Sequence, residues 1–192
     1  MKYFIYLLLV FFFVSCGKNY VPKPKGYLRL DYPNPNYEKV ESELPFYFEI
    51  NKSGSELESK KIVSSTESYG INIKYPLLKG TIFLTYKSIN ANRDNLLAFL
   101  KDAQNLPQKH MIKADAVLEE GYENTVSRVY GMFYEVDGNA ASQAQFYVTD
   151  SVNHFLTGSL YFYAKPNYDS ILPAANYLQK DIKHIMETIT WK

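Results

Sequence analysis

A short polar segment, Thr149-Asp150-Ser151-Val152-Asn153-His154, holds the three side-chain types of a nucleophilic triad. In such a site a serine attacks, a histidine takes its proton, and an acid orients the histidine. Here all three lie close together, in what the flanking alternation predicts to be a hairpin turn, where Asp and Ser ordinarily bond backbone N–H groups. The sequence also lacks the G-x-S-x-G elbow that exposes a catalytic serine. We therefore predict a structural turn and assign no catalytic residue.

The three histidines, His110, His154 and His184, show no metal-ligand spacing. The chain has no H-E-x-x-H motif, and its single cysteine has no companion for a thiolate site. We expect no metal site and no cofactor.

The stretch Gly138–Gln143 lies between two alternating segments and is too poor in glycine for a phosphate loop. It is a hairpin tip on one interpretation and a partner contact on the other, because polar loops on rigid strands often carry binding. The candidate partner-contact residues from both turns are Asn139, Ser142, Gln143, Asp150 and His154.

The single cysteine, Cys16, directly follows the apolar run Tyr3–Val14, with Lys2 before the run and Ser15 after it. A run of this length is too short to span a bilayer, which takes about 20 residues, and it matches a secretory signal. A lone cysteine at this point favours lipidation, although Phe13-Val14-Ser15 is a loose lipobox. The alternative is an ordinary secretory signal with an incidental cysteine.

Residues after Cys16 are rich in proline, which favours extended backbone and a semi-stiff spacer. Residues 27–32 alternate in polarity, so we expect an edge strand or a docked segment there and a tether partly pinned to the domain. We divide the chain into a signal peptide (1–15), a lipidated cysteine with its tether (16–45) and a globular domain (46–192).

The composition fits one folded domain, with 46% apolar and 21% charged residues. The 18 Tyr and 12 Phe favour a sheet. Basic and acidic residues number 21 and 20, and removing Lys2 with the signal leaves 20 of each. Nothing in this balance attracts nucleic acid. The tyrosines form either a stacking platform for sugars or proteins, or the core if helices cover both sheet faces.

Alternating segments predict strands, and apolar residues three or four apart predict helices. The expected strands are 46–50, 70–75, 80–87, 126–137, 142–149 and 154–164, the last three forming an antiparallel meander. Asn92 is expected to cap a helix over 93–105, and a closing helix is expected from Asp169 or Ser170. Lys109–Glu120 is a second helix or an irregular arm. The predicted fold class is α+β, a single domain with an antiparallel β-sheet and packed helices, and its order of elements fits a PsbP-like or Mog1-like sandwich.

Several segments form a recognisable pattern: PKPKGYLRLDYP (22–33), LPFYFEI (44–50), INIKYP (71–76), the long stretch 129–173 with GNAAS and TDS-x-x-HFL, and ETITW (187–191). In these segments the sequence resembles the GldD family of gliding-motility lipoproteins of Bacteroidetes. The family's lipidated cysteine matches Cys16. Some relatives carry extra cysteines where this chain has Leu44 and Ser68-Tyr69, so the resemblance implies no disulfide here.

The resemblance implies a non-enzymatic accessory role in gliding motility and type IX secretion, with other envelope proteins and lipoproteins of that machinery as partners. No acidic cluster follows Cys16, and in such bacteria acidic residues there mark surface export. We therefore expect an outer-membrane lipoprotein that faces the periplasm. Two alternatives stay open: a lipid-binding or glycan-binding module of the same machinery, and a hydrolase that uses Ser151 and His154.

Overall fold

The computed structural model describes residues 26, 27, 29–111, 114–163 and 168–192, without the side chains of 106–111 and 168. The expected signal peptide, Cys16 and the first part of the expected tether lie outside the described residues.

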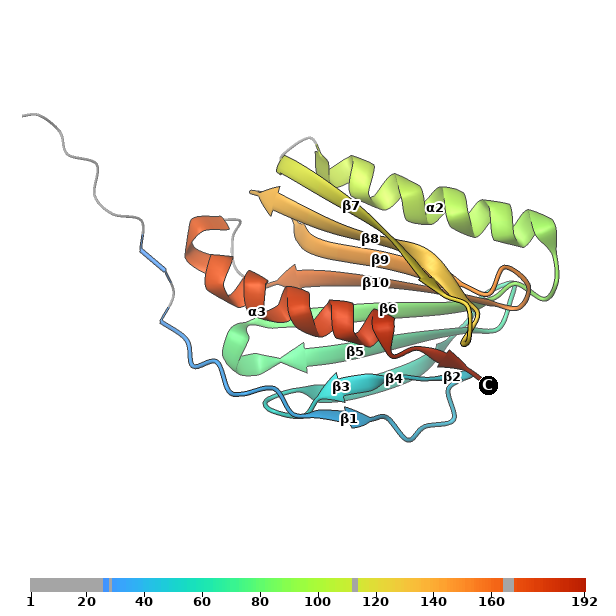
Figure 1. Cartoon of the computed structure of the whole chain (residues 1–192), viewed down its shortest axis with the longest axis horizontal. Coiled ribbons are helices and arrows are strands. Elements are labelled where there is room, and N and C mark those ends of the chain that lie inside the picture. Colours follow the sequence, from blue (N-terminus) through green and yellow to red (C-terminus); the bar gives the residue numbers. More distant parts are fainter. Residues whose placement is uncertain (1–25, 28, 112–113, 164–167) are drawn as a thin grey trace, which may run out of the picture.

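Seven antiparallel strands form the main sheet in the order β4-β5-β6-β10-β9-β8-β7 (Figure 1). Their bounds are β4 Glu56–Ile62, β5 Ser68–Tyr75, β6 Gly80–Ser88, β7 Ala114–Asn124, β8 Val129–Gly138, β9 Ser142–Thr149 and β10 His154–Phe162, with a short 3-10 turn at Pro76–Leu78. The predicted meander is confirmed, since β8 pairs with β9 and β9 pairs with β10.

Helices α2 (Arg93–Met111) and α3 (Tyr168–Glu187) cover opposite faces of this sheet. The neighbouring residues Phe155 and Leu156 of β10 point to opposite faces. Phe155 packs in the small cluster beneath α2, and Leu156 packs in the main core beneath α3. The domain is therefore α+β with three layers. Tyr75, Tyr86 and Tyr134 are core residues, whereas Tyr163 is 70% exposed, so the interpretation of the tyrosines as core holds for only some of them.

Both helices follow from their local sequence. Asn92 caps α2 as predicted, because its Oδ1 accepts a hydrogen bond from the Asp94 N–H at 2.8 Å. Leu178, Ile182 and Ile185 of α3 share one face and are buried against the sheet. The helix begins at Tyr168, before the expected cap, so Pro173 lies inside it instead of in its first turn.

The prediction of a helix or irregular arm over Lys109–Glu120 was wrong. Helix α2 continues to Met111, and β7 pairs with β8 along its whole length. Strand β4 was not predicted. Both β4 and β7 are the outer strands of the sheet, and both are rich in charged, exposed residues.

Three short strands, β1 (Tyr37–Lys39), β2 (Phe46–Tyr47) and β3 (Glu49–Asn51), lie beside α3. Strand β1 pairs with β3, and β2 pairs with the C-terminal strand β11 (Thr190–Trp191). Val40 and Leu44 are buried in the main core. Part of the segment expected as tether is therefore docked on the domain.

The docked part differs from the one that alternation indicated. The described residues of 27–32 form no strand, although Leu30 packs against the core and the Tyr32 ring lies 5.6 Å from that of Tyr177. The regular pairing begins only at Tyr37.

The loops between the strands lie at two opposite ends of the main sheet, which we call the tether end and the far end. The tether end holds the loops 76–79 and 139–141 and the start of α3, and the far end holds the loops 63–67, 89–92, 125–128 and 150–153. Figure 1 shows the chain arriving from one side and the C-terminus lying at the other. Among the described residues, neither helix is long and apolar enough to cross a bilayer.

Candidate functional site

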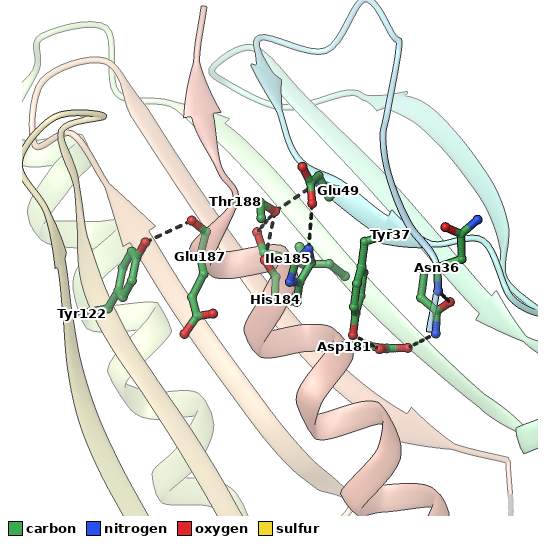
Figure 2. Close-up of polar contacts among 10 residues, drawn as sticks. Asn36, Tyr37, Glu49, Tyr122, Asp181, His184, Ile185, Glu187 and Thr188 are labelled. Atoms are coloured by element: carbon green, nitrogen blue, oxygen red, sulfur yellow. Dashed lines mark hydrogen bonds and ion pairs between the residues drawn. The ribbon is translucent and has the colours of Figure 1, made fainter. Parts of the chain in front are cut away.

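A buried carboxylate on α3 binds the segment that leads in from the tether. Asp181 is only 1% exposed. The Tyr37 hydroxyl donates to its Oδ1 at 2.6 Å (Figure 2). Asn51 Nδ2 donates to Asp181 Oδ2 at 3.1 Å. We call Tyr37, Asn51, Tyr177, Asp181 and His184 the clasp. It joins β1 and β3 to helix α3.

The clasp extends toward the tether through Asn51 and Tyr177. Asn51 Oδ1 accepts from the Asn36 N–H at 3.1 Å, and its Nδ2 also donates to the Tyr177 hydroxyl at 2.8 Å. The Tyr177 hydroxyl in turn donates to the Pro33 carbonyl at 2.8 Å. Residues 33–37 are thus held along α3 by side chains of the helix and of β3.

His184 closes the clasp on its other side. Its ring stacks on Tyr37 with centroids 3.7 Å apart, and its Nε2 lies 2.8 Å from Glu49 Oε2. One turn further, Thr188 Oγ1 accepts from the Glu49 N–H at 3.1 Å. The last turns of α3 therefore fix both β1 and β3.

The tyrosines of this site are neutral donors. Burial, followed by the hydrogen bond to Asp181 and its negative charge, raises the pKa of Tyr37 far above 10. Burial and the charge of Asp181 raise the pKa of Tyr75 in the same direction, although the Tyr75 hydroxyl has no hydrogen-bond partner. Because both phenols stay protonated at neutral pH, Tyr37 keeps its hydrogen bond to the Asp181 carboxylate.

The clasp was not predicted from the sequence. One signal was present: Asp181 lies three residues after Leu178 and one before Ile182, on the apolar stripe of α3. A charged residue on a buried face needs a partner. Its partners Tyr37 and Asn51 are 144 and 130 residues away in the chain.

The segment Thr149–His154 is the tight turn that was predicted. Asp150 Oδ1 accepts from the backbone N–H groups of Val152, Asn153 and His154 at 2.8 to 2.9 Å. Ser151 has a left-handed φ of 66° and is exposed. The Asp150 carboxylate binds backbone N–H groups and makes no hydrogen bond to the His154 ring, so these residues do not have the geometry of a catalytic triad.

His154 belongs to an aromatic cluster at the far end. Its Nδ1 lies 2.8 Å from the Tyr86 hydroxyl, and its ring stacks on Trp191 at 5.0 Å with planes 6° apart. Burial raises the pKa of Tyr86 to about 12. The cluster fixes the C-terminal strand β11 on the start of β10.

Acid is expected to weaken the fold in two steps. Burial lowers the pKa of His154 and the charge of Asp150 restores it only in part, so the folded pKa stays below 6.5. Burial alone raises the pKa of Asp150, but the three backbone N–H bonds and the His154 charge outweigh it, and the net pKa is below 3.8. In both cases the folded state binds fewer protons, so stability is complete above the ordinary pKa and falls below it.

Urea unfolding between about pH 8 and 3 measures both steps. His154→Gln is expected to flatten the slope just below pH 6.5, the ordinary value of this group. Asp150→Asn is expected to flatten it below 3.8. Unchanged slopes in both variants would contradict the assignment.

The other predicted contact residues lie at the opposite end of the sheet. Asn139 is exposed in the loop 139–141. Ser142 and Gln143 are buried: Gln143 Nε2 donates to the Ala140 carbonyl at 2.8 Å, and the Ser142 hydroxyl donates to the Ala144 carbonyl at 3.1 Å. These two side chains serve the hairpin and do not face outward. The five candidates therefore do not form one surface.

Metal-binding side chains do not gather in the part of the chain that the structure describes. His154 and His184 are engaged in the far-end cluster and the clasp. The side chain of His110 lies outside the described residues.

Comparison with protein-family models matches residues 17–191 to the model described as gliding motility lipoprotein GldD. Comparisons with curated proteins and with solved structures gave no significant match. The matched range includes the docked segment, both helices, all eleven strands and the clasp. The match begins directly after Cys16, as the resemblance of the motifs implied. The chain therefore belongs to the GldD family of gliding-motility lipoproteins, anchored at a membrane of the cell envelope.

Proposed function

We propose that this protein is a non-enzymatic accessory factor of gliding motility and type IX secretion that acts by binding other envelope proteins of the machinery. Lipid on Cys16 holds it on the periplasmic face of the outer membrane. The observation that carries the proposal is the family match over residues 17–191. Acyl chains contribute about 0.8 kcal/mol per buried methylene, enough for stable anchoring when two or more are attached.

The clasp supports a defined orientation of the domain. It holds residues 33–37 along α3, and Leu30 and Tyr32 also pack on the domain, so about 13 residues, 17–29, remain as spacer. At 3.1 Å per residue a fully extended spacer of this length reaches about 40 Å. Because the chain leaves the domain on the side of the tether end, the far end points away from the lipid.

Exposed apolar side chains at the far end support a partner surface there. Val63, Val126 and Val152 are exposed in three different hairpin loops. The three loops lie along one end of the sheet, from the β4–β5 edge through the β9–β10 turn to the β7–β8 edge, and so offer three apolar contact points on one face. We assign partner binding to these loops, with Asp150 and His154 beneath them as the rigid base.

The primary test combines gene deletion with Cys16→Ala. Deletion is expected to abolish gliding and type IX secretion. The Cys16→Ala chain is expected to leave the membrane fraction and to restore gliding poorly, because restriction to a surface raises effective concentration. A matched Ser15→Ala chain keeps the cysteine and should complement fully. Normal gliding and secretion in the deleted strain would refute the proposed role.

Site-specific crosslinking in cells locates the partner surface. A photoreactive residue at Val126 is expected to capture an envelope protein of the machinery. The matched control is Leu77, an equally apolar, exposed residue at the tether end. Capture from Leu77 but not from Val126 would contradict the assignment to the far end.

A ligand-binding role is the second candidate, because the structure contains a cleft between sheet and helix.

A further inference from the structure

A cleft opens between α2 and the sheet, on the face opposite the clasp. Its volume is about 360 Å³, within the range of small-molecule sites. The lining residues come from β6, β10 and α2: Thr85, Lys87, Phe155, Thr157, Phe99, Asp102, Ala103 and Asn105.

The charges of this cleft neutralise each other. Lys87 Nζ lies 3.9 Å from Asp102 Oδ2 and 4.7 Å from the centre of the Phe99 ring. Among the lining residues whose side chains the structure describes, the remaining polar groups are two hydroxyls and an amide, and the Thr157 hydroxyl reaches the Thr85 carbonyl only at 3.5 Å. A lining of neutral hydrogen-bonding groups, aromatic rings and one compensated ion pair suits an uncharged, hydroxyl-rich ligand.

The sheet surface beside the cleft also carries neutral polar and aromatic side chains. Pairing places Ser159 opposite both Gln145 and Phe83, two residues along from Thr157 and on the same face. Phe83 is exposed and meets the Tyr161 ring edge-on at 5.8 Å. Gln145 is 3% exposed, and both its amide atoms lack a hydrogen-bond partner. A buried unpaired amide is costly, and Gln145 faces the same side of the sheet as the cleft residue Thr157, two positions along the paired strand.

We propose that this cleft binds an N-acetylated saccharide. The acetyl methyl fits against Ala103 and the aromatic rings, and the acetamide N–H and C=O fit the side chains of Asn105 and the threonines. The ring hydroxyls fit Lys87 and Asp102, which supply a donor and an acceptor side by side. The site does not depend on the partner surface of the far end.

The test is calorimetric titration of the full mature lipoprotein in lipid nanodiscs with the tetramer of N-acetylglucosamine. Saturable binding is expected, with the glucose tetramer at least about tenfold weaker because it lacks the acetamide. Soluble peptidoglycan fragments and lipopolysaccharide sugars, added separately, distinguish the two envelope sources of such sugars. Absence of binding at about 10 mM of each would overturn the proposal.

Two variants and one control locate the site. Lys87→Met and Asn105→Leu are each expected to weaken binding at least about fivefold. Lys74→Met is the matched control: Lys74 lies on the same sheet face and pairs with Glu58 at 2.6 Å, outside the cleft. Thermal unfolding checks that all three fold. Binding that survives both cleft variants, or that falls equally with Lys74→Met, would overturn the assignment while leaving the role in motility untouched.

Discussion

Replacing Gly131 with alanine is expected to lower the free energy of unfolding by more than about 3 kcal/mol. Gly131 lies in β8, opposite Val148 of β9 and Tyr122 of β7. A Cβ at this position would lie 1.8 Å from the Tyr147 carbonyl oxygen and 2.8 Å from its carbon. These are backbone atoms of the adjacent strand, so relief requires β8 and β9 to separate. Urea unfolding followed by circular dichroism measures the loss.

Gly121→Ala is the matched control, because Gly121 lies in the adjacent strand β7 and a Cβ there meets nothing within 4 Å. Its stability is expected to change by no more than about 0.5 kcal/mol. Equal unfolding midpoints for the two alanine variants would show that β8 and β9 do not approach so closely.

Tyr37→Phe is expected to cost about 1 to 3 kcal/mol, because it removes one donor from a buried carboxylate. Asp181→Asn is expected to cost a similar amount, because an amide accepts on one side only and must turn its N–H toward either the Tyr37 hydroxyl or Asn51 Nδ2. The double variant is expected to cost less than the sum of the two, because Tyr37→Phe removes one of the donors that the amide would face. Each variant should also expose residues 33–39 to limited proteolysis before the rest of the domain unfolds. Denaturant titration and the rate of the first cleavage measure the two effects.

Tyr122→Phe is the control for the clasp. Tyr122 contacts the other flank of α3, where its hydroxyl donates to the exposed Glu187 carbonyl at 3.1 Å (Figure 2). Its loss should cost less than about 0.5 kcal/mol, because water replaces the bond. Strict additivity of Tyr37→Phe and Asp181→Asn would mean that their 2.6 Å contact does not contribute to stability.

The central strands and α3 were predictable because their burial patterns follow their periods. In β5, Ile71, Ile73 and Tyr75 alternate with half-buried residues, and in α3 the apolar stripe faces the sheet. The outer strands β4 and β7 were not predictable in this way. Neither alternates, because outer strands carry exposed charges that discourage pairing with other chains.

The clasp and the cleft could not be predicted from local sequence patterns, because their residues are far apart in the chain. Tyr37 looked like part of a proline-rich spacer, and its role depends on Asp181 at the other end of the chain. The cleft combines β6, α2 and β10, which only the topology brings together. The turn at Thr149–His154 was predictable because its bonds are made within six residues. Lipidation of Cys16 and the likeness to a PsbP-like or Mog1-like sandwich stay predictions.

The pairing of β1 with β3 determines how the domain responds to a pull from the membrane. Tyr37 lies opposite Asn51 and Lys39 opposite Glu49, so this strand pair is open on the side where the N-terminal segment arrives. Tension from that side unzips the ladder one bond at a time, which is its weakest direction. The bonds of Tyr177 to Pro33 and of Asp181 to Tyr37 lie at that opening and anchor the segment to a helix. Mechanical resistance at this attachment then depends on the side-chain bonds to α3 more than on the β1–β3 ladder.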